Sequence, residues 1–193
     1  MFTRPSVVLE LIWIVWLCSW VAASFWSGRT QKKIATLETW TYRAAMIAGG
    51  ILLVPWIAPV LGEKQIWQVG YAGAYLLAAV MVAGLAFTWW GRIYLGQLWS
   101  SVITRKEGHQ IVDTGPYALV RHPIYTGLII ALLATAAAEG RITGLIGAAF
   151  VTFGIWLKAR TEERFLMAEL GQEVYGSYCR RVPMLVPFLG SRQ

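Results

Sequence analysis

Two polar stretches hold the residues whose types and spacing could do chemistry. The first is EGHQIVDTGPYALVRHPIY, residues 107–125, which contains both histidines of the chain, His109 and His122. Its glycines and prolines predict turns, and Pro123 is typical of a first helical residue. By composition alone the stretch is equally typical of an ordinary loop at a membrane surface.

The second stretch, KARTEERFLMAELG, covers residues 158–171. Lys158 and Glu162 are four residues apart and therefore share one face of a helix, and Glu163 follows directly. A solvated, charge-paired helix end is the commoner meaning of such a run. Beside a low-dielectric boundary, adjacent carboxylates next to cations can also hold a charged ligand.

Other kinds of site are not indicated by the sequence. It contains no G-x-G-x-x-G after a strand, no P-loop and no H-E-x-x-H. Cys18 lies in an apolar run and Cys179 in the polar tail, so we expect no disulfide between them. Neither cysteine has a zinc-like spacing to histidine, and we expect no metal site.

The elements that must position these residues are membrane spans. Of 193 residues, 57% are apolar or aromatic and only 14% are charged, against roughly a quarter charged in a soluble domain. This composition excludes an ordinary cytosolic enzyme, a disordered tail and a secreted disulfide scaffold. It predicts one all-α polytopic membrane bundle of about five transmembrane helices. The expected spans are residues 7–26, 42–61, 66–90 (extending as far as 95), 124–138 and 142–157.

Two features of these spans predict local geometry. Pro55 and Pro59 predict a kink in the distal half of the second span. The last two spans are separated by only three residues, 139–141, which predicts a C-terminal helical hairpin. The glycines expected to allow close backbone approach in this hairpin are Gly140, Gly144 and Gly147.

The positive charges predict the orientation. Fourteen of the 17 Lys and Arg residues follow the first span, follow the third span, or lie in the tail, which leaves Arg4, Lys64 and Arg141 on the other side. The positive-inside rule then places the N-terminus outside and the C-terminus in the cytoplasm. Membrane topology thus accounts for the net charge of +7, and no nucleic-acid partner is expected. Both polar stretches fall on the cytoplasmic face.

The motifs resemble a known family. LGQLWS at 95–100, GHQIVDTGPYALVRHPIYTG at 108–127 and TEERFLMAELGQEVYGSYCRRVP at 161–183 are similar to the isoprenylcysteine carboxyl methyltransferase family. That family belongs to a wider group with the membrane phospholipid N-methyltransferases. The resemblance implies a single membrane domain, in which three N-terminal spans (1–94) precede a methyltransferase-like part (95–193). It also implies a pocket for S-adenosyl-L-methionine formed by the cytoplasmic loop and the C-terminal segment.

The resemblance also implies roles for particular residues. Those expected to bind the cofactor are His109, Gln110, Ile111, Val112, Tyr117, His122, Pro123, Ile124, Tyr125 and Glu162. Glu162 would bind the methionine amino group. The catalytic candidates are Lys158 and Arg160, which would orient the acceptor, and Glu163.

One position departs from the family pattern and bears on the acceptor. Lys158 stands where the family has an arginine that meets the substrate carboxylate, and a lysine lacks the bidentate fork. The favoured interpretation is methyl transfer to the oxygen of a lipophilic or lipidated acceptor. The alternatives are a phosphatidylethanolamine-type N-methyltransferase and, more distantly, an NADPH-dependent steroid-reductase-like enzyme or a non-catalytic membrane scaffold. The sequence leaves the oligomeric state open.

Overall fold

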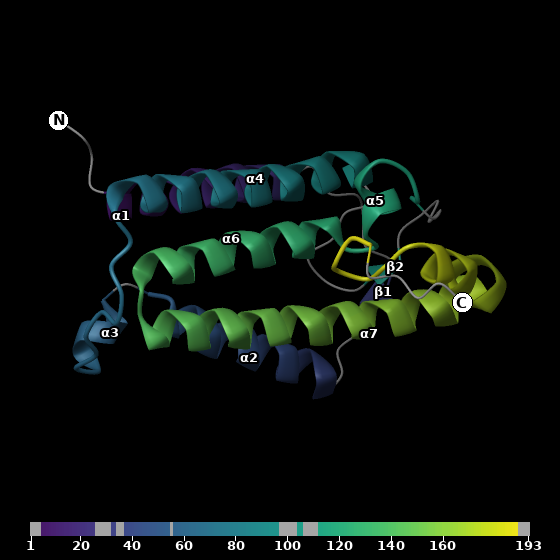
Figure 1. Cartoon of the computed structure of the whole chain (residues 1–193). Coiled ribbons are helices and arrows are strands. Elements are labelled where there is room, and N and C mark those ends of the chain that lie inside the picture. The colour runs from purple at the N-terminus through teal and green to yellow at the C-terminus, as the bar shows by residue number, and fades with distance from the viewer. Residues whose placement is uncertain are drawn as a thin grey trace.

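The computed structural model describes residues 5–25, 32–33, 37–54, 56–96, 104–105 and 112–188, with the backbone alone at 32–33, 37 and 104–105. Five long helices lie lengthwise along the molecule (Figure 1): α1 Pro5–Ser24, α2 Leu37–Leu52, α4 Tyr71–Leu95, α6 Pro123–Glu139 and α7 Ile142–Arg181. Helix α7 is kinked at Gly171, and its turns after this residue leave the lengthwise direction. Short elements complete the described part of the chain: α3 Ile57–Val60, α5 Pro116–Leu119, and the two-residue strands β1 Lys32–Lys33 and β2 Thr104–Arg105, which pair antiparallel.

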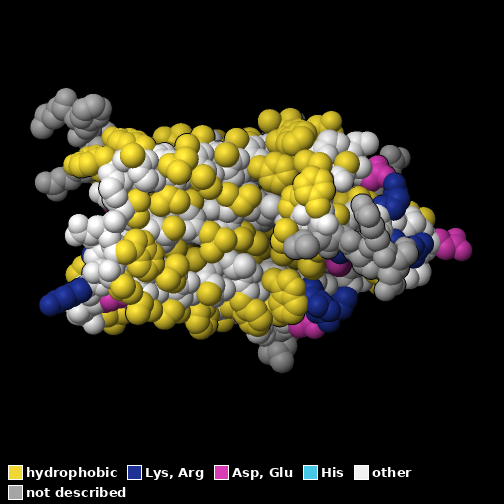
Figure 2. Space-filling model, viewed as in Figure 1, with side chains coloured by type: hydrophobic (Ala, Val, Ile, Leu, Met, Phe, Trp, Pro, Cys, Tyr) yellow, Lys and Arg dark blue, Asp and Glu magenta, His cyan; other side chains and the backbone are white. Residues whose placement is uncertain are grey.

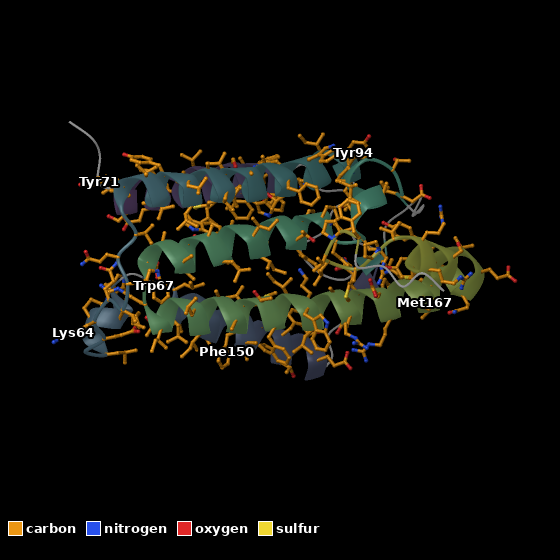
Figure 3. All side chains as sticks on the ribbon, viewed as in Figure 1. Lys64, Trp67, Tyr71, Tyr94, Phe150 and Met167 are labelled. Atoms are coloured by element: carbon orange, nitrogen blue, oxygen red, sulfur yellow. The ribbon has the colours of Figure 1, made fainter. Side chains whose placement is uncertain are left out.

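The molecule is an integral membrane protein. Helices α1, α4 and α7 are long and apolar enough to cross a membrane, and α6 is a shorter apolar helix. Hydrophobic side chains cover the long middle of the face shown in Figure 2, whereas Lys and Arg gather at the end that carries α5 and the C-terminus. Lys64 marks the opposite end (Figure 3). This distribution follows from the cost of placing charges in hydrocarbon.

The expected second span is wrong in its distal half. Helix α2 ends at Leu52, and a turn at Leu53 and Val54 separates it from the single turn of α3. The sequence accounts for this break, because Pro55 lacks an amide hydrogen and disfavours helical geometry at the residue before it. The third span also starts later than expected, at Tyr71, although it does continue to Leu95.

The connection before α4 closes the end of the bundle marked by Lys64. The backbone carbonyl of Gly140, in the turn between α6 and α7, accepts hydrogen bonds from the amides of Ile66 and Trp67. A carboxylate oxygen of Glu63 accepts hydrogen bonds from the first amides of α7, at Ile142 (2.6 Å) and Thr143 (3.2 Å). An acid at a helix N-terminus satisfies amides that have no partner within the helix and complements the helix dipole. Hydrogen bonding to Thr143 accordingly lowers the pKa of Glu63 against desolvation.

Tryptophan side chains tie α1 to the other helices. The indole N–H of Trp16 donates to the hydroxyl of Thr88 in α4 at 2.9 Å, and that of Trp13 donates to the hydroxyl of Thr135 in α6 at 3.1 Å. An indole N–H buried in an apolar setting needs such an acceptor. These bonds therefore set the register of α1 against α4 and α6.

Glycines allow close contact within two pairs of helices. A Cβ on Gly127 of α6 would meet the backbone carbonyl of Gly84 in α4, and a Cβ on Gly147 of α7 would lie 2.8 Å from the carbonyl of Gly49 in α2. The expected hairpin of α6 and α7 is present, with Gly140 in the left-handed conformation that its turn requires. The role expected for Gly147 is wrong, because this residue packs against α2 and only Gly144 faces α6, near Ala136.

A matched pair of adjacent glycines tests the α2–α7 contact. A Cβ on Gly49 would lie 2.5 Å from the Gly147 carbonyl, whereas one on Gly50 would meet nothing within 4 Å. We expect Gly49→Ala to force the two helices apart and cost about 1–3 kcal/mol. Gly50→Ala should leave stability unchanged or raise it by up to about 1 kcal/mol, since Ala favours helix. Thermal unfolding of both variants in detergent measures the difference, and equal midpoints would contradict the packing.

Candidate active site

The candidate site lies at the charged end of the bundle, where α5, the start of α6 and the later turns of α7 come together (Figure 1). In Figure 3, Tyr94 and Met167 are at this end, whereas Phe150 lies in the first half of α7, toward the end marked by Lys64. The site thus combines α5 and the start of α6, which are close in sequence, with a part of α7 more than 30 residues later. It lies where the apolar part of α7 gives way to charged residues.

Glu162 lies at the centre of a group of side chains from α6 and α7. The hydroxyl of Tyr125 donates to Glu162 Oε2 at 2.8 Å, and His122 Nδ1 lies 4.0 Å from the same oxygen. The rings of His122 and Tyr125 stack at 5.3 Å with planes 10° apart. The ammonium nitrogen Nζ of Lys158 lies 5.2 Å from the centre of the Tyr125 ring. Four of the residues expected from the sequence therefore come together.

Glu163 has a different environment from its neighbour. Arg121 donates hydrogen bonds to both carboxylate oxygens of Glu163, from Nε to Oε1 at 2.6 Å and from Nη2 to Oε2 at 3.1 Å. His122 Nε2 lies 3.2 Å from Oε1. Desolvation lowers the pKa of Arg121, but hydrogen bonding and charge attraction from Glu163 outweigh it and raise the pKa overall. The pair is therefore an ionised, bidentate salt bridge.

Arg121 also holds the segment that follows α7. Its Nη1 donates to the backbone carbonyls of Cys179, at 2.9 Å, and Val182. The backbone continues the contact: the amide of Arg121 donates to the Pro183 carbonyl at 2.8 Å and that of His122 to the Met184 carbonyl at 3.1 Å. The hydroxyl of Thr126 donates to the Leu185 carbonyl at 2.6 Å. Residues 121–126 and 182–185 thus form one ladder of hydrogen bonds.

The remaining expected cofactor residues are mostly in the packed core beside this group. Tyr117 is buried, donates to the Gly91 carbonyl at 3.3 Å and accepts through its own carbonyl from the Tyr178 hydroxyl at 2.7 Å. Pro123 and Ile124 are buried against Gly91, and Val112 is half-buried. His109, Gln110 and Ile111 lie outside the described residues.

The two expected acceptor-orienting cations point in different directions. Arg160 is exposed, and its guanidinium lies 5.0 Å over the ring of Trp156. Two residues along a helix turn the side chain by about 200°, so Arg160 points away from the face that carries Lys158, Glu162 and the Tyr125 ring. Of the two, Lys158 is the cation next to the site.

Arg121 and the ladder at 182–185 are the parts that the sequence did not reveal as site components. A signal was present in the R-H-P-x-Y motif, where Arg121 directly precedes His122. Its partner Glu163 is 42 residues away, and no spacing rule connects the two. Among the described residues no group of three or more His, Cys, Asp or Glu side chains could hold a metal ion.

Known proteins with similar sequences match the part of the chain that contains this site. Residues 76–168 match the sequence model of the isoprenylcysteine carboxyl methyltransferase family. This region is of the isoprenylcysteine carboxyl methyltransferase family, as the motifs indicated. It extends from α4 through the first part of α7 and so contains Arg121, His122, Lys158, Glu162 and Glu163.

Three relatives show the range of proteins with similar sequences. The chain is 27% identical over 157 residues to protein-S-isoprenylcysteine O-methyltransferase B of Arabidopsis thaliana. The aligned region covers 77% of this chain and 74% of that protein. It is 33% identical over 165 residues to methanethiol S-methyltransferase of Pseudomonas sp. (strain GM41(2012)), covering 79% and 61% respectively. It is 28% identical over 142 residues to nickel-cobalt-cadmium resistance protein NccN of Alcaligenes xylosoxydans xylosoxydans, covering 72% and 62%.

The chain therefore spans less than two thirds of the last two relatives. The family and the named relatives support an O- or S-methyltransferase enzyme.

The salt bridge within the site has a measurable weight. Arg121 and Glu163 side chains are only 11% and 18% exposed, so Glu163→Ala leaves a largely buried guanidinium without its partner. We expect a loss of about 3–5 kcal/mol in unfolding free energy. The exposed Arg181–Asp113 pair, 3.3 Å apart, is the matched control, and Arg181→Ala should cost under about 1 kcal/mol. Denaturation in detergent measures both; similar small losses would show that the inner pair does not hold the site.

Proposed function

We propose that the protein is an S-adenosyl-L-methionine-dependent methyltransferase of the membrane that transfers the methyl group to an anionic oxygen or sulfur of a lipophilic acceptor. The observation that carries this proposal is the position of Glu162. Its side chain is 29% exposed and held by Tyr125, next to Lys158 and at the polar end of an apolar bundle.

The residues present fit the polar end of this cofactor. A site that binds an ammonium group needs a carboxylate and other hydrogen-bond acceptors whose orientations are fixed before the ligand binds. Glu162 meets this need, because the Tyr125 hydroxyl orients its carboxylate and the neighbouring Arg121 is committed to Glu163. When bound, S-adenosyl-L-methionine supplies an electrophilic methyl group on a sulfonium.

The acceptor is inferred from the cation that faces the site. Lys158 presents a compact point charge, which attracts an anion without imposing the two-pronged geometry of an arginine on a carboxylate. A carboxylate is already ionised at neutral pH, and a nearby cation favours the thiolate form of a thiol. Alignment and exclusion of water would then be the main contributions of the protein. The names of the relatives, an isoprenylcysteine O-methyltransferase and a methanethiol S-methyltransferase, support both acceptor atoms.

An amine acceptor fits the site less well. A protonated amine must lose a proton before it can attack, and Glu163 is the acid that the sequence offers as a base. Arg121 and His122 occupy both oxygens of Glu163, so its carboxylate is committed to structural bonds. For this reason we favour O- or S-methylation over phosphatidylethanolamine N-methylation.

The distribution of positive charge supports a site on the cytoplasmic face of the membrane. The described arrangement puts α5 and the C-terminus at the end rich in Lys and Arg (Figure 2), and the positive-inside rule assigns such an end to the cytoplasmic face. The N-terminus would then lie outside, with five passes of the chain through the membrane.

Cofactor binding tests the central part of this proposal. We expect the purified protein in detergent to bind S-adenosylhomocysteine in isothermal calorimetry, and Glu162→Gln to weaken binding by about tenfold or more, since it removes the charge that meets the ammonium. Glu169→Gln, later on α7, serves as the control and should bind normally. Absence of heat with the wild-type protein, together with no competition against labelled S-adenosylmethionine, would refute the proposal.

Acceptor orientation separates Lys158 from Arg160. We expect Lys158→Met to raise the acceptor KM or lower kcat by tenfold or more (about 1.4 kcal/mol) while leaving S-adenosylhomocysteine affinity nearly unchanged. Arg160→Met, on the outer face of α7, should change neither. The acceptors to compare with labelled cofactor are a prenylcysteine analogue, an alkyl thiol and phosphatidylethanolamine. Equal activity of both variants would remove Lys158 from the proposed role, and labelled phosphatidylethanolamine would favour the N-methyl alternative.

A further inference from the structure

The adjacent acids Glu162 and Glu163 do different work, and the division between them originates at Arg121. Glu163 is neutralised by a bidentate guanidinium. Glu162 accepts a hydrogen bond from the uncharged Tyr125 hydroxyl. One carboxylate is therefore held by a bidentate guanidinium, while the other, which also interacts with the charge of Lys158, accepts a hydrogen bond from Tyr125.

His122 lies between the two acids and has two distinct ring nitrogens. An ionised carboxylate only accepts hydrogen bonds, so the 3.2 Å contact with Glu163 Oε1 requires a proton on Nε2 of His122. In the neutral ring, Nδ1 is then an acceptor, and it is the nitrogen that lies 4.0 Å from Glu162 Oε2.

The orientation of this ring is fixed from several sides. The amide of His122 donates to Met184, its ring stacks on Tyr125, and its side chain is only 8% exposed. The charged groups that face it are Arg121, Glu162, Glu163 and, across the Tyr125 ring, Lys158. The ring is therefore held with Nδ1 toward Glu162.

We propose that Arg121 is a positioning residue that acts through Glu163 to hold His122 in the Nε2–H tautomer, so that His122 Nδ1 and the Glu162 carboxylate form a two-acceptor subsite for a ligand ammonium group. An ammonium carries three N–H donors and no acceptor, which suits one charged and one neutral acceptor side by side. The inference rests on the proposed function, since the ammonium is that of the methionyl part of the cofactor.

Two ligands that differ only in the amino group provide the binding test. The quantities to measure are the affinities of the protein in detergent for S-adenosylhomocysteine and for its des-amino analogue. Arg121→Gln should weaken S-adenosylhomocysteine binding about tenfold and change binding of the des-amino analogue by less than about twofold. Arg181→Gln, which breaks an exposed ion pair at the same end of the molecule, should change neither. Equal loss for both ligands in Arg121→Gln would overturn the proposal, because it would show a general disturbance of the site.

The tautomer itself gives a readout that requires no ligand. With ¹⁵N-labelled histidine and His122→Gln for assignment, we expect the His122 signals at neutral pH to show a protonated Nε2 and an unprotonated Nδ1. In Arg121→Gln, where the charge of Glu163 is no longer balanced, we expect a second proton on the His122 ring, at Nδ1. This second proton should be absent from Arg121→Gln/Glu163→Gln, which has no charged group at position 163. A wild-type ring protonated at Nδ1 would overturn the proposal.

A conservative variant covers the case in which Arg121→Gln does not fold. Arg121→Lys keeps the charge but cannot reach both Glu163 oxygens and the two carbonyls together, and we expect about a threefold loss for S-adenosylhomocysteine alone. If Arg121→Lys binds S-adenosylhomocysteine as tightly as the wild type and leaves the His122 tautomer unchanged, the bidentate guanidinium contact with Glu163 has no positioning role. If the wild-type protein binds neither ligand, the proposed function fails, which is distinct from failure of this inference.

Discussion

The arginine fork at Arg121 is the interaction on which the arrangement of the charged end depends. One guanidinium joins the segment before α6, the carboxylate of Glu163 on α7 and the carbonyls of Cys179 and Val182. Its donors are planar and fixed in direction, so it sets the relative positions of three segments at once. No single apolar contact constrains direction in this way.

The apolar part of the bundle holds these segments in register by a different means. In lipid the hydrophobic effect does not favour helix association, and close backbone approach and hydrogen bonds take its place. The contacts Gly84–Gly127 and Gly49–Gly147 bring α4 to α6 and α2 to α7, while the indoles of α1 find hydroxyl acceptors. The polar end is therefore supported by a bundle whose contacts are small and specific.

The separation of roles between Glu162 and Glu163 connects this architecture to methyl transfer. A site for a ligand ammonium group needs a carboxylate that can still accept hydrogen bonds. Adjacent residues on a helix differ by about 100° in direction, which turns Glu163 toward Arg121 and leaves Glu162 beside Tyr125 and Lys158. With two adjacent glutamates at the membrane boundary, one helix supplies both a structural carboxylate and a carboxylate that faces the ligand.

The sequence by itself determined the class of the protein and the region of the site. Runs of apolar residues predicted α1, α6, the apolar part of α7 and the turn between the last two helices, because helix length and hydropathy are local properties. The same reasoning failed at the second span, where α2 ends at Leu52 instead of continuing through a kink. It also failed at the hairpin glycines, since local sequence does not say which helix a glycine meets. The motifs also placed Tyr125, His122, Lys158 and Glu162 in one site, and the structure brings these four together.

Only the tertiary structure decided which charges balance one another. It paired Arg121 with Glu163, directed Arg160 onto Trp156, and laid residues 182–185 along the start of α6. These contacts join residues that are far apart in sequence, and their partners depend on how the helices pack and rotate. Local sequence carries the types of charge but not their directions, and the directions determine which carboxylate remains for a ligand.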